Sequence, residues 1–179
     1  EDEVRERVAS ALAKTGLEPT EALLCRSPFA LSGGQQRCVA LAGVLSMRQP
    51  VLVLDEPMAG LDPRGREHVR ALLQDLKKQG TALLVVTHSM DDVAELADHV
   101  VILDHGRVVA DGTPREVFTT RADALESIGI PSAQAFAERL ASMGLSFAAS
   151  SANAAENIPL TIDELVASLT EVLPHGAAR

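Results

Sequence analysis

The chain has 179 residues, 46% of them hydrophobic, which is enough for a folded domain with a small appendage. Its formal net charge is −9, and its Lys and Arg residues are scattered along the sequence. Because nucleic-acid binding needs a concentrated basic patch, this pattern argues against it. No apolar stretch is long enough to span a bilayer, so work at a membrane would need a partner that spans it. Cys25 and Cys38 match no metal-binding spacing, and a reduced cytosolic setting is their simplest interpretation.

The N-terminal part of the sequence predicts helices followed by a buried strand. Apolar residues at helical spacing predict a helix over 4–16, and Ser32 is a suitable N-cap for another helix that stops before Pro50. The run Val51–Leu54 shows no polar alternation. This run therefore predicts a strand buried on both faces of a parallel sheet.

The sequence then continues with alternating helix and strand patterns. Pro63 stands near the start of a helix that Gly80 ends, Leu83–Val86 is another apolar strand, and a short helix is expected over 90–97. The turn sequence Asp104–Arg107 joins two more apolar runs, both expected strands: Val100–Leu103 and Val108–Ala110. This alternation predicts an α/β sheet with right-handed crossovers.

The C-terminal third changes character. Helical segments around 133–143 and 162–173 flank a stretch rich in Ala, Ser and Asn, over 148–157, with the composition of a linker. Capping boxes at Thr113–Glu116 and Thr161–Glu164 are expected to begin helices. The last helix carries an apolar stripe, which would pack on the domain itself, on a dimer mate or on a partner subunit: Leu165, Val166, Leu169 and Val172.

Two carboxylates end the first predicted strand. Asp55 and Glu56 follow four apolar residues, at the strand end where open α/β sheets bind ligands. Asp55 could hold Mg²⁺ through water, because this ion keeps much of its hydration shell, and Glu56 could accept a proton from an attacking water. The alternative is a solvated turn; the glycine motif upstream favours a phosphoryl-transfer site.

Ser32-Gly33-Gly34 has the chemistry of an anion-binding helix start. It offers a hydroxyl and bare backbone N–H groups where the helix dipole favours an anion, and glycine lets a phosphate approach closely. By itself this tripeptide would favour an ordinary capped helix. Gln35-Gln36-Arg37 and the spacing to Asp55 favour the binding site instead.

His88 lies just past the strand Leu83–Val86, where it could contact a terminal phosphate from the same sheet edge. A lone histidine there is more often structural or solvated, but its order and spacing after Glu56 favour the phosphate contact. Asp62 could be only the N-cap of the helix that begins at Pro63. We expect it to be both that cap and a contact across a subunit boundary.

The run from Leu31 to about Phe118 resembles the second half of the ATP-binding cassette (ABC) ATPases. The resemblance implies that Leu31-Ser32-Gly33-Gly34-Gln35 is the signature motif, which closes over ATP held by the opposite subunit. It also implies a role for each of the other site residues: Asp55 holds the Walker B metal, Glu56 is the catalytic base, Gly60-Leu61-Asp62 is the D-loop and His88 is the switch histidine.

The same resemblance implies a domain plan. Residues 1–118 would form the C-terminal part of an ABC ATPase domain, with the helical subdomain and its signature motif over 1–48 and the core from Walker B to the switch histidine over 49–118. Residues 119–179 would form a helical C-terminal extension. The expected fold class is α/β, the C-terminal half of a P-loop NTPase with a mostly parallel sheet.

The chain contains no G-x-x-x-x-G-K-[ST] phosphate loop, and it starts at Glu1 rather than at a methionine. We therefore expect the C-terminal portion of a subunit, which would contribute the signature half of a composite site but would not hold nucleotide in the usual way. The chain also departs from the commoner family residues at Met58 and Cys38, where no catalytic role is expected.

Segments around the signature, Arg26–Ala30 and Ala42–Met47, resemble the energy-coupling factor type of ABC importer, as do Pro63–Arg66 and Pro159–Leu165. These prokaryotic transporters take up vitamins or cobalt and nickel ions. The resemblance implies ATP and Mg²⁺ as cofactors and a second ATPase subunit, identical or different. It further implies a transmembrane coupling protein and a substrate-binding membrane subunit as partners, no nucleic acid, and a place on the cytoplasmic face of the cell membrane.

The predicted function is thus ATP hydrolysis that powers import. Three alternatives stay open: the ATPase of another ABC importer, a non-hydrolysing module that docks through its tail and regulates a complete partner, and a soluble ABC protein that acts on nucleic acid or ribosomes. The negative charge and the single signature motif argue against the last of these.

Overall fold

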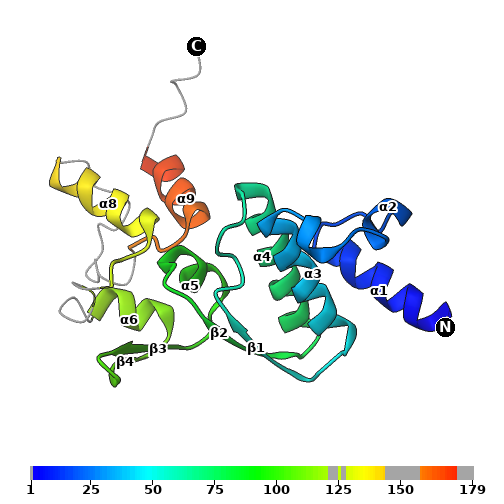
Figure 1. Ribbon diagram of the computed structural model, residues 1–179. Coiled ribbons are helices and arrows are strands. Elements are labelled where there is room, and N and C mark those ends of the chain that lie inside the picture. The colour runs from blue at the N-terminus through cyan, green and yellow to red at the C-terminus, as the bar shows by residue number, and fades with distance from the viewer. Residues whose placement is uncertain (1, 121–124, 126–127, 144–157, 173–179) are drawn as a thin grey trace, which may run out of the picture. The chain divides into compact units, whose positions relative to one another are not determined.

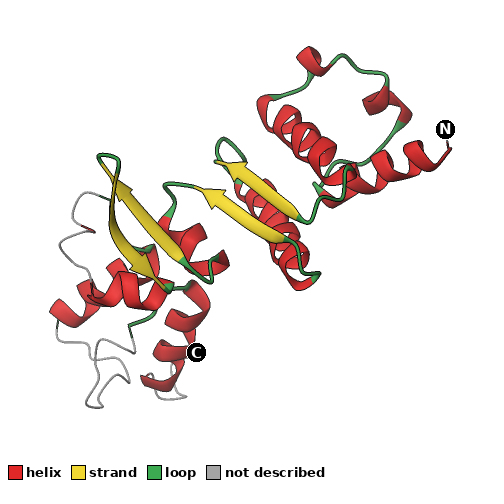
Figure 2. Cartoon of the chain, turned by 90° about the horizontal axis from the view of Figure 1, so that it is seen from below, coloured by secondary structure: helices red, strands yellow, loops and turns green. Residues whose placement is uncertain are grey.

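The computed structural model describes residues 2–120, 125, 128–143 and 158–172 (Figure 1). The chain forms two compact units that divide between Thr87 and His88. Each unit contains a pair of strands with helices beside it, and Figure 2 shows the strands in yellow.

The first unit is built from helices and a parallel strand pair. Its elements, in chain order, are α1 (Asp2–Lys14), α2 (Glu21–Leu24), the 3₁₀ helix η1 (Pro28–Ala30), α3 (Gly33–Ser46), β1 (Val51–Asp55), α4 (Pro63–Lys78) and β2 (Ala82–Val86). In the parallel register Val51 lies opposite Ala82 and Asp55 lies opposite Val86. Both strands therefore end at one edge, where the predicted carboxylates lie.

Side-chain caps determine where α3 and α4 begin. Ser32 Oγ accepts a hydrogen bond from the Gln35 N–H at 3.3 Å, and the Ser32 N–H donates to Gln35 Oε1 at 3.1 Å, which completes a capping box. Asp62 Oδ1 accepts from the Gly65 N–H at 2.7 Å, and Pro63 is the first residue of α4. Both predicted N-caps are confirmed.

Apolar helix faces hold the first unit together. α1 packs on α3 through a small cluster: Ala11, Leu12 and Ala42, with Leu17, Val39 and Leu45 around them. α4 lies against β2 and buries Val69, Leu72 and Leu73. Each fully buried Val or Leu side chain stabilises the fold by about 1.5–3 kcal/mol, so the helical spacing of these residues is what keeps α4 on the sheet.

The prediction that Val51–Leu54 is buried on both faces is wrong. Leu52 and Leu54 are 4% and 8% exposed, whereas Val51 and Val53 are 58% and 67% exposed. Successive side chains of a strand point to opposite faces, and the exposed set continues onto β2 at Leu84 and Val86. The described residues of this unit therefore bury one face of the strand pair and leave its other face exposed.

The second unit combines an antiparallel hairpin with helices. Its described elements are α5 (Met90–Leu96), β3 (Val100–Asp104), β4 (Arg107–Gly112), α6 (Pro114–Thr120), α8 (Ser132–Ser142) and α9 (Ile162–Val172). His105 and Gly106 both have positive φ, 45° and 75°. This two-residue turn matches the right-handed twist of the strands, and the predicted hairpin is confirmed.

The core of the second unit joins the hairpin to the tail. Its buried residues come from β3, β4, α6 and the segments that follow: Val100, Ile102, Ala110, Val117, Phe118, Leu125 and Leu160. α9 packs on α8, with Leu165 and Leu169 of the predicted stripe half-buried and Val166 54% exposed. The stripe thus packs partly on the chain itself.

Other predictions for the tail have mixed outcomes. The capping box at Thr113 forms in both directions, because the Glu116 N–H donates to Thr113 Oγ1 at 3.3 Å and the Thr113 N–H donates to Glu116 Oε2 at 2.8 Å. At Thr161 the N-cap half forms, from the Glu164 N–H to Thr161 Oγ1 at 3.2 Å, while Glu164 Oε2 accepts from the Leu160 N–H. The expected linker over 148–157 lies outside the described residues. The division of the chain at residue 118 stays a prediction.

Candidate functional site

The carboxylates Asp55 and Glu56 lie at the carboxyl end of β1. Asp55 is the last residue of the strand, and its side chain is exposed. Glu56 has a φ of +47°, a left-handed conformation that costs a residue with a side chain about 1–3 kcal/mol. Its N–H still donates to the Val86 carbonyl at 2.9 Å. The chain therefore turns sharply while pairing with β2, and the two carboxylates take different directions.

Thr87 holds the Glu56 carboxylate. Its hydroxyl donates to Glu56 Oε2 at 3.4 Å, from the residue that directly follows β2. Sequence reasoning did not assign this contact. The signal was present, because parallel strands end at the same edge and Thr87 is the first polar residue after β2.

The signature segment forms an open helix start. Leu31 is buried, while Ser32 and Gly33 are exposed. A Cβ added to Gly33 would meet no atom within 4 Å, so packing gives no reason for glycine there. Close approach of a ligand to the backbone is a reason. The Gln35 side chain is engaged in the capping box, so its contribution is to fix the helix start.

The turn after Glu56 leads into the capped start of α4. Gly60 has a φ of +71°, which favours glycine at this position. The Ala59 N–H donates to the Glu56 carbonyl at 3.2 Å, and the Leu61 N–H donates to the Met58 carbonyl at 3.4 Å. The segment 56–61 is therefore a compact turn held by two long internal hydrogen bonds.

One face of α3 lies along this turn. Arg37 Nη1 donates a hydrogen bond to the Ala59 carbonyl, and a Cβ on Gly34 would lie 3.6 Å from Leu61 Cδ2. Burial raises the pKa of the Cys38 thiol, and the negative charge of Asp62 raises that pKa further. The fold thus brings the signature helix to the predicted D-loop within one unit. Sequence reasoning assigned no contact to Arg37.

His88 is the first residue of the second unit and is exposed. The predicted signature motif, D-loop, Asp55 and Glu56 all belong to the first unit. His88 directly follows Thr87 in the sequence, and Thr87 is the residue whose hydroxyl binds Glu56.

The donor set suits a weakly held magnesium ion. Among the described residues, no group of three or more His, Cys, Asp or Glu side chains could enclose a metal ion. Mg²⁺ at nucleotide sites keeps several waters and takes one or two carboxylates plus phosphate oxygens. The exposed Asp55 carboxylate at the strand end fits that demand.

One family model matches part of the chain. Residues 21–91 match the family model "AAA domain, putative AbiEii toxin, Type IV TA system". That segment contains the signature motif, both carboxylates, the D-loop and His88.

Curated relatives match almost the whole chain. The energy-coupling factor transporter ATP-binding protein EcfA2 of Latilactobacillus sakei is 46% identical, and the match covers 99% of this chain and 58% of the relative. The chain spans between half and three fifths of the length of such relatives. The predicted resemblance to the ATPases of energy-coupling factor transporters is confirmed.

Solved structures agree with the fold class. The structure of cbiO1 from Clostridium perfringens, part of the ABC transporter complex cbiONQ, is 38% identical with a TM-score of 0.58, over 80% of this chain and 53% of that one. The ATP-binding cassette MJ0796, a dimer bound to ADP and Pi, is 30% identical with a TM-score of 0.56, over 61% of this chain and 46% of that one. The predicted ABC ATPase fold is confirmed.

Searched over the described residues, the chain has no helix with both the length and the apolar character needed to cross a bilayer.

Proposed function

We propose that this chain, whose sequence resembles the ATP-binding proteins of energy-coupling factor transporters along nearly its whole length, belongs to an ATPase subunit that powers solute import. The observation that supports this most is the end of β1. There Asp55 is exposed, and Glu56 leaves the strand with a left-handed φ and accepts a hydrogen bond from Thr87. A carboxylate on a strained backbone, bound by a hydroxyl at the end of the next strand, suits a base that must face a water molecule.

The two carboxylates divide the work of ATP hydrolysis. Asp55 would hold Mg²⁺, and Glu56 accepts the proton of the attacking water. The ion, when bound, neutralises charge on the phosphate oxygens. The Thr87 hydroxyl, which donates to Glu56 Oε2, helps to orient this carboxylate.

The signature motif acts on nucleotide held by a second ATPase subunit. Within the motif Leu31-Ser32-Gly33-Gly34-Gln35, the backbone N–H groups of Gly33 and Gly34 lie at the start of a 14-residue helix, where the helix dipole favours an anion. Ser32 Oγ accepts from Gln35 and keeps its own O–H to donate. Gly60-Leu61-Asp62 would cross the boundary between the subunits, and His88 would contact the terminal phosphate.

The proposed assembly works at the cytoplasmic face of a prokaryotic cell membrane. It contains a second ATPase subunit, a transmembrane coupling protein and a substrate-binding membrane subunit. A vitamin or a cobalt or nickel ion is the expected cargo, as the resemblance to energy-coupling factor importers implies. Nucleic acid is not an expected partner, because the chain is acidic.

The test uses the native protein with its partner subunits. Glu56→Gln should preserve ATP binding and lower kcat by about 10²-fold or more, because an amide cannot accept the proton. The control is Glu6→Gln, the same chemical change on the exposed face of α1. Unchanged hydrolysis by Glu56→Gln would remove Glu56 from the role of base.

An intact mass of the native protein, with sequencing of peptides on the N-terminal side of Glu1, completes the test. A longer chain with a glycine-lysine phosphate loop supports the hydrolytic proposal. A native chain that begins near Glu1 and hydrolyses no ATP with its partners would replace it with a non-hydrolysing regulatory module.

A further inference from the structure

We propose that Arg37 is a positioning residue that ties the anion-binding start of α3 to the turn carrying Glu56. Arg37 Nη1 donates to the carbonyl of Ala59, 22 positions further along the chain. This inference rests on the proposed function for its catalytic consequence, whereas the contact itself lies entirely within the first unit.

Arg37 lies on a face of α3 with two residues that also lie near the turn. Gly34, Arg37 and Cys38 follow the i, i+3, i+4 spacing of neighbours on a helix surface. Gly34 faces Leu61, and Arg37 binds the Ala59 carbonyl. The negative charge of Asp62 contributes to the raised pKa of the Cys38 thiol. The face therefore follows the turn from Ala59 to Asp62, and Arg37 supplies its directional hydrogen bond.

The turn needs support from outside itself. It contains two left-handed residues, Glu56 and Gly60, with φ of +47° and +71°. Its internal hydrogen bonds are long, at 3.2 and 3.4 Å, and such bonds contribute little. Arg37 adds a charge-assisted hydrogen bond to the Ala59 carbonyl from outside the turn, beside the bond from the Glu56 N–H to the Val86 carbonyl at 2.9 Å.

The consequence is a link between two parts of the composite site. An anion bound at Ser32 and Gly33 immobilises the first turn of α3, and Arg37 lies one turn further along the same helix. Fixing α3 therefore fixes the Ala59 carbonyl and, through it, the backbone of Glu56. The signature motif that closes over one nucleotide thus orders the base and the D-loop of its own subunit.

Hydrogen exchange of the native protein tests the contact without any need for catalysis. Arg37→Met keeps an unbranched side chain of high helix propensity and removes all five donors. It should raise amide exchange at Ala59 and Leu61 about tenfold, with exchange in α1 unchanged. The matched control, Arg5→Met on the exposed face of α1, should change neither amide.

Arg37→Lys provides a second, milder variant that keeps the charge and three N–H donors on a single nitrogen. It should give exchange at Ala59 and Leu61 between those of the wild type and Arg37→Met. If Arg37→Met fails to fold, the exchange rates of Arg37→Lys test the proposal in its place. Unchanged exchange at both amides in the foldable variants would overturn the proposal, as would a rise spread evenly over α1 and α4.

Steady-state kinetics then test the positioning role of Arg37 separately from the proposed function. In the native complex, Arg37→Met should lower kcat for ATP about tenfold while KM stays within about twofold, and Arg37→Lys should restore part of the loss. An equal fall in kcat and in ATP affinity would overturn the positioning role. If the wild-type complex does not hydrolyse ATP, the proposed function is wrong, and the hydrogen-exchange result alone then tests the role of Arg37.

Discussion

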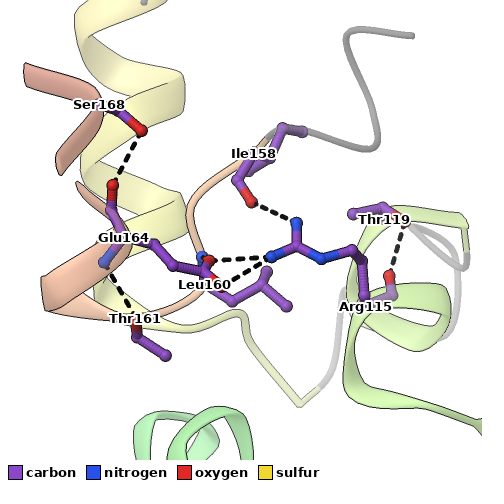
Figure 3. A network of polar contacts seen from close by, with 7 residues as sticks. All are labelled: Arg115, Thr119, Ile158, Leu160, Thr161, Glu164 and Ser168. Atoms are coloured by element: carbon purple, nitrogen blue, oxygen red, sulfur yellow. Dashed lines mark hydrogen bonds and ion pairs between the residues drawn. The ribbon is translucent and has the colours of Figure 1, made fainter. Parts of the chain in front are cut away.

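Arg115 of α6 and Glu164 of α9 form an ion pair in which Arg115 Nη2 lies 2.8 and 2.9 Å from the two carboxylate oxygens of Glu164 (Figure 3). Arg115 Nη1 also donates to the Ile158 carbonyl at 2.9 Å. The Leu160 N–H donates to Glu164 Oε2 at 2.8 Å. One arginine therefore fastens both α9 and the segment before it to α6.

We predict that Arg115→Met loosens this segment without unfolding the unit. Both side chains are partly exposed, at 38% and 44%, so the coupling energy with Glu164→Gln should be about 0.5–1 kcal/mol. A double-mutant cycle measured by urea unfolding gives this value. Arg139→Met, on an exposed arginine of α8, should be additive with Glu164→Gln; additivity for Arg115 as well would contradict the prediction.

Thr87→Val should impair hydrolysis but not ATP binding. Valine keeps the branched shape and removes the hydroxyl that donates to Glu56 Oε2. Because the hydroxyl lies 3.4 Å from Glu56 Oε2, which is long for an O–H···O hydrogen bond, the contact contributes about 1 kcal/mol at most, and kcat measured on the native complex should fall about threefold to fivefold. Thr87→Ser, which restores the hydroxyl, should recover most of the rate. Loss of rate in Thr87→Ser without loss in Thr87→Val would contradict the prediction and would mean that the methyl group matters instead.

Two substitutions of Asp62 separate its cap from its charge. Asp62→Ala should lower the free energy of unfolding by about 1 kcal/mol, because the Gly65 N–H loses its acceptor. Asp62→Asn keeps an N-cap oxygen and should cost only a few tenths of a kcal/mol. Chemical denaturation of both variants measures this. If hydrolysis in the complex also falls in Asp62→Asn, the charge serves the proposed contact between subunits.

The second unit should lose stability at acid pH through Glu116. The N–H of Thr113, and then its hydroxyl, hold the pKa of Glu116 below its ordinary value of 4.5; His99 lowers it further and burial opposes the shift. Because the folded pKa is the lower one, the stabilisation is complete above the unfolded value and is lost as the pH falls through the folded value.

Unfolding midpoints measured from about pH 6 down to about pH 3 would show this loss. Glu116→Gln, which keeps a capping oxygen and cannot titrate, should flatten the pH dependence in that window. An identical pH dependence in wild type and variant would show that other carboxylates carry it.

Local patterns predicted most of the elements. Ser32 and Asp62 cap helices because their oxygens reach backbone N–H groups three residues on, an interaction that needs only adjacent sequence. The His105-Gly106 turn likewise depends on the conformations available to two residues. α2 and η1 were not predicted, since short helices in a stretch without clear periodicity leave little signal.

The candidate site was likewise only partly predictable from the sequence. Its residue types and their spacing were legible in the sequence, since Asp55, Glu56 and the Ser32-Gly33-Gly34 segment follow directly from strand and helix ends. The Thr87 and Arg37 contacts were not, because each joins residues more than 20 positions apart. Their formation depends on the parallel register of β1 with β2 and on the face that α3 turns toward residues 59–62.

The sequence by itself determined the elements, their caps and the chemistry at the ends of β1 and α3, because these depend on interactions within a few residues. The tertiary structure alone decided which face of β1 is covered, and it decided that Arg37 supports the turn of Glu56 and that Arg115 fastens the tail. Burial and long-range hydrogen bonds are properties of packed elements, so local patterns carry too little information to specify them.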